Sequence, residues 1–350
     1  ERVWLSPPHM GEKEKAYVLE AFDTNWVAPL GPNVDIFEKQ LAAYTVSAES
    51  VSLSSGTAAL HLALMGVGVT KGDVVLCQSM TFGASAFPIQ YVGADPVFID
   101  SEPHTWNMDP ALLKQAIVET LDAGKKPAAI VVVHLYGMPA NMQAISEIAK
   151  TFGIPLIEDA AEALGSKYVD KPCGGLADVG ILSFNGNKII TTSGGGALLS
   201  NQTELIAKVR HWSAQSKEPA PYYLHKEIGY NYRMSNICAG IGRGQMEVLQ
   251  ERVETRRAHF ETYRRLLADV PEVSFLDEPE GSFSNRWLTT VLFDKSLGEE
   301  VHEKVRIALE KVNIESRPLW KPLHQQPVFE NCKAYLNGVS DDLFARGLCL

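Results

Sequence analysis

Short apolar runs alternate with segments of helical periodicity between Val51 and about Ser200. The runs are Val74–Leu76, Pro96–Asp100, Ala129–His134, Pro155–Asp159, Gly180–Phe184 and Ala197–Ser200. Alternation of this kind predicts an α/β fold, in which a mostly parallel sheet lies between two layers of helices. Ligands of such folds bind where strands end and helices begin, so the residues that follow each run are the first candidates for chemistry.

After about Met234 the pattern changes to a long helical segment, Gln245–Val270, followed by short strand-like runs such as Trp287–Phe293. The change predicts a second, smaller domain. The glycines from Gly240 to Gly244 resemble a dinucleotide-binding loop only superficially, because no strand precedes them and the spacing is incomplete. Close packing of a helix against its neighbours is the better interpretation of these glycines.

Composition narrows the classes of function. The chain has 350 residues, 45% of them hydrophobic, and a formal net charge of −10. This charge argues against a general nucleic-acid binder, because such binding depends on clustered Lys and Arg. The five cysteines form no CxxC pair, and the histidines, including His61, His134 and His211, show neither ligand spacing nor a carboxylate partner in the sequence. We therefore expect no metal and read these histidines as structural.

The sequence carries no membrane or secretion signal. No apolar stretch reaches the ~18 residues that a membrane span requires, and the first residues lack the apolar core of a signal peptide. With its unpaired cysteines, the chain is predicted to be cytoplasmic, without membrane insertion. It starts without Met and stops within the apolar run Leu348–Leu350, so we expect the natural protein to continue and a C-terminal element to be missing.

The most informative segment is Ser183–Lys188, which is followed by Ile189–Thr192 and by three glycines at positions 194–196. It places Lys188 between a buried strand and a glycine-rich loop. An amine at the edge of an apolar core loses its proton more easily, and it can then hold an aldehyde cofactor as a Schiff base. A solvated loop lysine is the ordinary alternative, but the flanking residues favour a catalytic amine.

Two further patterns fit such a cofactor. Gly56 and Thr57 lie at a predicted helix start, where free N–H groups and the helix dipole favour a phosphate. Asp159 ends a predicted strand, and a carboxylate there could pair with a protonated pyridine nitrogen. Taken singly, these are an ordinary capped helix start and a cap for the next helix. Their coincidence with Ser183 and Lys188 points to a pyridoxal phosphate site.

The same residues lie within longer motifs that resemble the DegT/DnrJ/EryC1/StrS family, whose members aminate nucleotide-linked keto-sugars on the aspartate-aminotransferase fold. The motifs are Trp26–Pro32, Ser55–Leu60, Thr81–Phe82, Glu158–Gly165, Ser183–Lys188 and Gly229–Ser235. Within the family, the segments Leu5–Met10, Asn185–Lys188 and Arg317–Lys321 are similar to the transaminases of the bacillosamine pathway.

The resemblance implies a fold and its division into domains. We expect PLP fold type I, with a mostly parallel seven-stranded sheet sandwiched by helices in a large domain of residues 11–240. A small α+β domain of residues 241–350 would pack with the N-terminal segment 1–10.

The resemblance also implies roles around the cofactor, pyridoxal 5′-phosphate (PLP). The cofactor-binding residues would be Gly56, Thr57, Phe82, Asp159, Glu162, Ser183, Lys188 and Asn231. Lys188 would form the Schiff base and shuttle protons, Asp159 would face the ring nitrogen, and Phe82 would stack on the ring. Gly56, Thr57 and Ser183 would hold the phosphate.

The resemblance also implies a second subunit and a shared proton at the cofactor. Asn231 would reach the cofactor phosphate of a second subunit, so the active unit would be a homodimer with two shared sites. Glu162 stands where Gln is more frequent in the family, and it would bond to the ring hydroxyl only if a proton is shared.

The implied substrate contacts come from three parts of the chain. They are Asn25, Trp26, Val27, Ala28, Gly56, Arg233, Arg317, Pro318, Leu319, Trp320, Lys321 and His324. The cations among them would offset a diphosphate, for which forked arginine hydrogen bonds are well suited. Taken alone, His324 is better read as structural, and Trp320 could belong to the core.

These roles imply a reaction. L-glutamate would give its amino group, leaving 2-oxoglutarate, and the amine would pass through the pyridoxamine form of the cofactor to C4 of a UDP-linked 4-keto-6-deoxy-N-acetylamino sugar. The product would be UDP-4-amino-4,6-dideoxy-N-acetylglucosamine, a bacillosamine-type precursor of glycans. The alternatives are a PLP-dependent sugar dehydratase, whose resemblance includes loss of the lysine, and a non-catalytic regulator that senses cofactor or sugar. Lys188 argues against the dehydratase.

Overall fold

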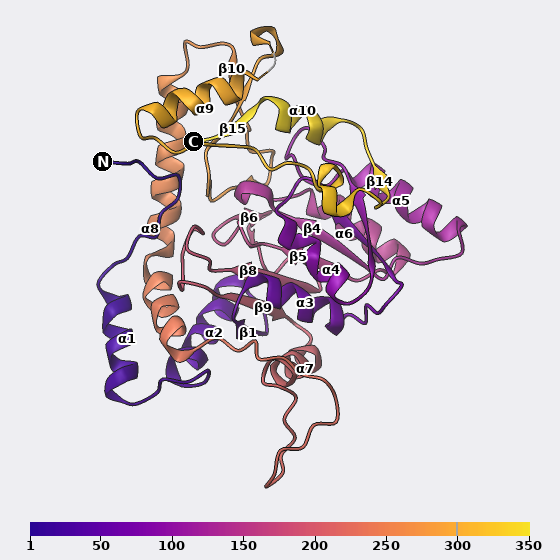
Figure 1. The fold of residues 1–350 in the computed structure, drawn as a ribbon, viewed down its shortest axis with the longest axis vertical. Helices are drawn as coiled ribbons and strands as arrows, with labels where there is room; N and C mark the ends of the chain where they lie inside the picture. Colours follow the sequence, from indigo (N-terminus) through magenta and orange to yellow (C-terminus); the bar gives the residue numbers. More distant parts are fainter. Residues whose placement is uncertain (299) are drawn as a thin grey trace.

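A single large sheet forms the centre of the molecule in the computed structural model, which describes residues 1–298 and 300–350. Its strand order is β1-β9-β8-β5-β4-β2-β3-β14 (Figure 1). The strands are β1 (Glu49–Leu53), β2 (Val74–Gln78), β3 (Asp95–Ile99), β4 (Ala129–Val133), β5 (Leu156–Asp159), β8 (Val179–Ser183), β9 (Gly196–Ser200) and β14 (Ala334–Tyr335). Only β9 pairs antiparallel with its neighbours in this sheet, so the predicted α/β fold with a mostly parallel sheet is confirmed.

The sheet differs from the expectation in one respect, because it has eight strands and the sequence predicted seven. The additional strand, β14, comes from the C-terminal region and pairs with β3 through residues Ala334 and Tyr335. A two-residue strand has no periodicity of its own, so only its packing on the edge of the sheet defines it.

Helices cover both faces of the sheet. The helices are α1 (Lys13–Asp23), α2 (Pro32–Thr45), α3 (Gly56–Gly66), α4 (Phe87–Tyr91), α5 (Pro110–Asp122), α6 (Met142–Phe152), α7 (Thr203–Ser213), α8 (Asn236–Leu266), α9 (Val301–Lys311) and α10 (Val339–Arg346). Alternate residues of β4 face opposite layers: Ile130 and Val132 pack with α5 and α6, whereas Val131 packs with α3 and α7. Because both faces are buried, such strands are continuous apolar runs, which is why the sequence pattern predicted them.

Helix α8 begins at Asn236, earlier than the predicted Gln245, and Ser235 caps it by accepting a hydrogen bond from the Cys238 N–H. Its glycines permit close contact with α1 and α2. A Cβ atom on Gly242 would lie 2.7 Å from the Phe37 ring, and one on Gly244 would lie 2.6 Å from the backbone nitrogen of Glu14. The interpretation of these glycines as a packing surface is therefore confirmed.

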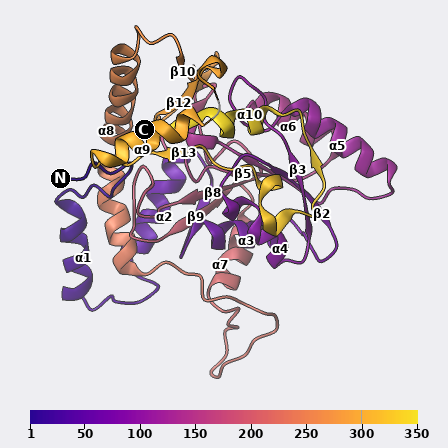
Figure 2. The same cartoon turned by 45° about the horizontal axis from the view of Figure 1, so that its top comes forward.

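Two small sheets accompany the large one: the C-terminal part carries the first (Figure 2), and the second joins β11 of that part to the hairpin β6–β7. One has the order β10-β12-β15-β13 and the other β11-β6-β7, from strands β6 (Lys167–Tyr168), β7 (Lys171–Pro172), β10 (Val273–Phe275), β11 (Ser282–Phe283), β12 (Thr290–Phe293), β13 (Arg317–Pro318) and β15 (Gly347–Cys349). The N-terminal segment joins this part, because Val3 exchanges backbone hydrogen bonds with Asn313 and Glu315. The boundary expected at residues 240 and 241 lies inside α8, and the division into domains stays a prediction.

Between α7 and α8 the chain makes a long excursion that projects from the body of the molecule in both views (Figures 1 and 2). Its exposed side chains include Tyr222, Tyr223 and Ile228. Among the described residues, no helix is both long enough and apolar enough to cross a membrane.

Candidate active site

The candidate site lies at the carboxyl ends of two neighbouring parallel strands. Asp159 is the last residue of β5, and it pairs in register with Ile181 of β8. Ser183 ends β8, and the chain then enters the loop 184–195, which carries Lys188. Parallel strands bring their carboxyl ends to one edge of a sheet, so the order of the strands places the acid and the amine together.

The amine of Lys188 lies between a carboxylate and an aromatic ring. Its Nζ atom is 3.5 Å from Oε1 of Glu162 and 4.3 Å from the centroid of the Trp287 ring, and its side chain is 13% exposed. A lysine in such a poorly solvated position can exchange its proton with a neighbour and act as a nucleophile. The position fits the amine at the edge of the core that the sequence predicted.

Asp159 is a buried carboxylate with two hydrogen-bond donors. Its Oδ2 accepts from the Ser85 hydroxyl at 2.7 Å, and its Oδ1 accepts from the Ala161 N–H at 3.1 Å. Burial raises the pKa of Asp159, while these two donors and the positive charge of Lys188 act in the opposite direction. The structure therefore fixes the carboxylate in place but leaves it poorly solvated, ready for a cationic partner.

Glu162 is buried beside it and is oriented by two groups. The Tyr136 N–H donates to Oε2 at 2.7 Å, and the Trp320 indole N–H donates to Oε1 at 3.4 Å. Burial raises the pKa of Glu162, and the nearby Lys188 lowers it. The sequence placed Glu162 near the cofactor, but it did not reveal this contact with the lysine.

The start of α3 offers backbone donors next to β8. Ser55 caps the helix by accepting from the Ala58 N–H at 3.0 Å, and no hydrogen bond within the described residues uses the N–H groups of Gly56 and Thr57. A Cβ atom on Gly56 would lie 3.0 Å from Cβ of Ser183, so the glycine keeps this corner open. Free N–H groups at the N-terminus of a helix suit a phosphate.

An aromatic cavity of about 290 Å³ lies next to these groups. It is lined by Thr81, Phe82, Gly83, Phe87, Trp320, Lys321, Leu323, Gln326, Val328 and Phe329. Phe82 is 61% exposed, and the centroid of its ring lies 6.5 Å from that of Trp320. Two of the expected substrate residues, Trp320 and Lys321, thus share a cavity with the aromatic residue expected to stack on the cofactor.

The other residues expected from 317 to 324 have varied surroundings. The exposed Arg317 forms an ion pair with Glu315, and Leu319 is buried in the core. The ring nitrogens of His324 contact the Ser79 hydroxyl at 2.7 Å and Asp341 at 3.0 Å. Both ring nitrogens are thus engaged within the protein, which agrees with the structural interpretation of this histidine.

The segment from Asn25 to Ala28 is exposed except for Ala28, and it is tied to the start of α8. The Asn236 side chain donates to the Trp26 carbonyl, and its N–H donates to the Ala28 carbonyl. Arg233, expected near the substrate, forms an ion pair with Glu38 at 2.8 Å and is 11% exposed.

Asn231 lies on the excursion between α7 and α8. It is exposed, and its backbone forms an isolated bridge with Ala214. Within the described chain it is therefore open to solvent. Its expected contact with the cofactor of a second subunit stays a prediction.

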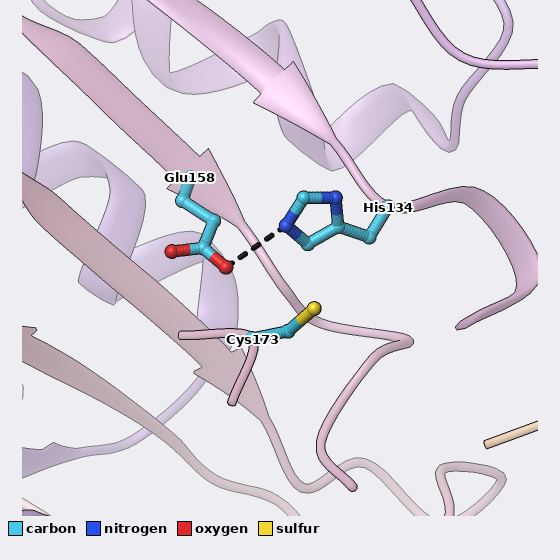
Figure 3. Close-up of side chains that lie close together, drawn as sticks. All are labelled: His134, Glu158 and Cys173. Atoms are coloured by element: carbon cyan, nitrogen blue, oxygen red, sulfur yellow. Dashed lines mark hydrogen bonds and ion pairs between the residues drawn. The ribbon is translucent and has the colours of Figure 1, made fainter. Parts of the chain in front are cut away.

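A second buried cluster, formed by His134, Glu158 and Cys173, lies close by (Figure 3). Nε2 of His134 lies 2.8 Å from Oε1 of Glu158, and Nδ1 accepts from the Ala140 N–H at 3.0 Å. The carboxylate also accepts the N–H groups of Gly174 and Leu176. A metal ion would have to displace these bonds, so the geometry is that of a structural clamp.

The expectation that these histidines lack a carboxylate partner is wrong for two of them. His134 contacts Glu158 from the neighbouring strand, and His211 lies 3.6 Å from Glu227. Neither pair could be found by spacing, because the partners are brought together by strand pairing and by the excursion after α7. The structural interpretation of His134 agrees with its hydrogen bonds.

Three further residues contact the site but were not predicted for it. Ser85 bonds to Asp159, Tyr136 bonds to Glu162 through its N–H and to the Trp320 N–H through its hydroxyl, and the Trp287 ring lies against Lys188. None has a local sequence signal. A serine, a tyrosine and a tryptophan in apolar surroundings are ordinary core residues until the fold brings them to the site.

Comparison with known proteins agrees with this geometry. The DegT/DnrJ/EryC1/StrS aminotransferase family matches residues 8–350. EpsN of Bacillus subtilis (strain 168), named as a pyridoxal phosphate-dependent aminotransferase, is 50% identical over 100% of this chain and 90% of its own length. GDP-perosamine synthase of Escherichia coli O157:H7 is 36% identical over 98% of this chain and 91% of its own.

A solved structure extends the similarity to three dimensions. The PLP form of Spr1654 from Streptococcus pneumoniae, named as a sugar aminotransferase, superposes with a TM-score of 0.91 at 27% identity, over 100% of this chain and 93% of its own. The fold is thus that of the type I PLP enzymes, and the site combines an amine, a buried acid and a helix start suited to phosphate.

The chain belongs to the DegT/DnrJ/EryC1/StrS aminotransferase family. It is a PLP-dependent sugar aminotransferase, and its own residues fit the cofactor. Gly56 leaves the corner beside Ser183 open, the adjacent N–H groups suit the phosphate, and the buried carboxyl group of Asp159 suits a protonated ring nitrogen.

Proposed function

We propose that this enzyme transfers the amino group of L-glutamate to C4 of a UDP-linked 4-keto-6-deoxy-N-acetylamino sugar, giving UDP-4-amino-4,6-dideoxy-N-acetylglucosamine. The observation that carries the proposal is the meeting of Lys188, Asp159 and the start of α3 at the ends of two adjacent strands. The similarity of the family's sugar aminotransferases supports the reaction type. The motifs shared with bacillosamine-pathway enzymes support the choice of sugar.

In this proposal different residues bind different parts of the cofactor. Gly56, Thr57 and Ser183 hold the phosphate, Phe82 covers the ring, and Asp159 keeps the ring nitrogen protonated by offering it a buried anion. When bound, PLP supplies an electron sink that stabilises the negative charge left on a substrate carbon.

Lys188 has two tasks, since it anchors the cofactor and, once released, carries protons. Its Nζ takes a proton from the substrate carbon and delivers it to a second carbon. It thus acts as a general acid and base held within reach of both. Trp287 and Glu162 limit where that nitrogen can lie, because they contact it from two directions. Orientation of this kind contributes to the rate by holding the reacting atoms together.

The sugar nucleotide would lie against the aromatic cavity beside Phe82 and Trp320. Lys321 lines this cavity, and Arg317 is exposed nearby in the sequence, so both could offset a diphosphate. Asn25, Trp26, Val27 and Ala28 would approach from the N-terminal side. Pro318, Leu319 and His324 would shape the segment that carries Trp320.

We also propose that the working unit is a cytoplasmic homodimer with shared sites. The excursion after α7 carries the exposed Asn231 together with Tyr222, Tyr223 and Ile228, whose exposed fractions are 67%, 86% and 81%. Apolar side chains exposed to this extent on a projecting segment favour burial against a partner. A second subunit would then receive Asn231 next to its cofactor phosphate, and Arg233 next to its substrate.

The test uses purified protein, PLP, L-glutamate and a panel of UDP-, GDP- and dTDP-linked 4-keto-6-deoxy sugars. We expect 2-oxoglutarate to form fastest with the UDP-linked N-acetylamino sugar, and NMR of the product to show nitrogen on C4. Faster turnover of a GDP-linked sugar would overturn the substrate. Absence of 2-oxoglutarate with every sugar, although glutamate bleaches the visible absorbance, would overturn the sugar reaction, and no spectral change at all would favour the regulator.

A further inference from the structure

Lys188 and Glu162 form a buried pair that amino transfer does not by itself explain. The Nζ and Oε1 atoms lie 3.5 Å apart, and the side chains are only 13% and 5% exposed. Opposite charges stabilise each other more strongly in poorly solvated surroundings than at the surface. At this distance Oε1 can accept a hydrogen bond from the ammonium form of Lys188, and an ammonium has no lone pair with which to attack a carbonyl.

The protein fixes the carboxylate rather than letting it find the lysine by chance. Oε2 is held at 2.7 Å by the N–H of Tyr136, whose backbone is in the left-handed region with φ of 54°. On the other side, Oε1 accepts the Trp320 indole N–H at 3.4 Å. These two contacts aim Oε1 at the amine and leave it able to accept a further hydrogen bond.

We propose that Glu162 is the proton partner of Lys188, keeping the amine charged until a ligand arrives and accepting its proton on Oε1 when the amine reacts. The transfer moves one proton from Nζ to Oε1, so a charged pair becomes a neutral pair and no charge leaves the buried site. The inference rests on the proposed function, in which Lys188 is the reactive amine. Burial raises the pKa of Glu162, which makes its carboxylate a better proton acceptor than that of a surface glutamate.

The other ionisable groups around Glu162 are less suited to this role. Asp159 already accepts hydrogen bonds from Ser85 and Ala161, and its charge raises the pKa of Glu162 further. Burial raises the pKa of both the Tyr136 hydroxyl and the Cys349 thiol, so these two groups stay neutral. Glu162 is thus the acceptor that the geometry and the charges favour.

The experiment measures how fast Lys188 reacts with acetic anhydride across a range of pH, by mass spectrometry, in enzyme freed of cofactor by dialysis with glutamate. Surface lysines of the same sample serve as the internal reference. We expect Glu162→Gln to increase labelling of Lys188 at neutral pH by about tenfold or more. A shift of one pH unit in the midpoint of the labelling curve corresponds to a tenfold change in the amount of uncharged amine.

Two control variants separate charge from packing. Trp320→Phe removes the other contact with Oε1 but keeps the carboxylate, so the pH midpoint should shift less than in Glu162→Gln. Glu147→Gln makes the same chemical change on the exposed face of α6 and should have no effect. Far-UV circular dichroism checks that each variant is folded, and Glu162→Asp, which keeps the charge, should label like wild type if the glutamine variant does not fold.

Addition of PLP distinguishes the two proposals. If PLP protects Lys188 in all variants and Glu162→Gln shifts the midpoint to lower pH, both stand. If PLP protects but the midpoint does not move, the proton-partner role is overturned and the proposed function survives. If PLP fails to protect Lys188 in the wild type, the proposed function is overturned, and with it this inference.

Discussion

Two buried clusters of ionisable side chains lie at the ends of β4 and β5, and they are built in opposite ways. In the clamp of His134 and Glu158, Nε2 of the ring bonds to Oε1 of the carboxylate, and backbone N–H groups donate to Nδ1 and to both carboxylate oxygens. In the site of Lys188, Glu162 and Asp159, the contacts of the lysine and of Oε1 are long, at 3.4 to 3.5 Å.

One strand, β5, contributes to both clusters. Glu158 and Asp159 are consecutive on β5, so their side chains point to opposite faces of the sheet. A fully bonded carboxylate has no capacity left for a ligand and stabilises the fold, whereas an incompletely bonded one costs stability and stays available for chemistry. Three substitutions and one change of pH can test whether the two clusters differ in this way.

Replacing Lys188 by Ala should reduce turnover by at least about 10³-fold, because the group that transfers the proton is lost. The free energy of unfolding should also fall, since the buried carboxylate of Glu162 loses the amine that lies 3.5 Å from it. Formation of 2-oxoglutarate and urea unfolding measure the two quantities. Retention of activity would show that Lys188 is not a catalytic residue.

Replacing Glu158 by Gln should lower the free energy of unfolding by about 3 kcal/mol, because an amide group would face two backbone donors and leave a buried donor unpaired. Urea unfolding measures the loss. The exposed Glu147→Gln serves as the control and should stay within about 0.5 kcal/mol of wild type. An equal effect of both substitutions would show that the clamp is not structural.

The site should make stability depend on pH with a definite sign. Burial raises the pKa values of Asp159 and Glu162 in the folded protein, so the folded state binds protons more tightly than the unfolded state. The stability that these groups contribute is therefore present at low pH, and it is lost as the pH rises from their unfolded-state to their folded-state pKa values. The loss is about 1.4 kcal/mol for each group and each pKa unit between the two states.

The measurement compares urea unfolding of cofactor-free wild type with that of the double variant Asp159→Asn, Glu162→Gln between acidic and neutral pH. We expect the stability of the wild type, relative to the variant, to fall across this range. A constant difference would mean that the two carboxylates are as well solvated as surface groups.

Replacing Ser85 by Ala should have the smallest effect. It removes the hydroxyl that donates to Asp159 at 2.7 Å, and a hydrogen bond to a charged group is worth about 1.5–3 kcal/mol. We expect PLP to bind about tenfold more weakly, because the carboxylate ionises less readily. Titration of the visible absorbance measures the affinity for PLP. Unchanged affinity would show that Asp159 does not contact the cofactor.

Much of the fold could be predicted because strands that are buried on both faces are continuous apolar runs in the sequence. Strand β5 was predicted to end at Asp159 and does so, since apolar residues give way to acids at that position. The first turns of α8 were not predicted, because glycines replace the apolar residues of a helical stripe there. Strand β14 is too short to have a pattern, so only tertiary packing defines it.

The site, like the fold, has features that follow from local sequence and features that depend on tertiary packing. Lys188, Asp159 and the start of α3 could be proposed from flanking residues and motifs, because each lies at the end of a strand or soon after one. The pairs of Glu158 with His134, Arg233 with Glu38 and Lys188 with Glu162 could not, since each joins residues far apart in the sequence. Which charges meet depends on the order of the strands, and the sequence pattern left that order open.

The reversed direction of β9 has a consequence for how the lysine is placed. Because β8 and β9 run antiparallel, Ser183 pairs with Gly196 and closes the loop 184–195 at its base. No crossover helix is needed here, so the loop can form as a hairpin whose closure costs little chain entropy. Amide hydrogen exchange should therefore find this turn protected together with its two flanking strands, as one cooperative unit that opens independently of the distant termini.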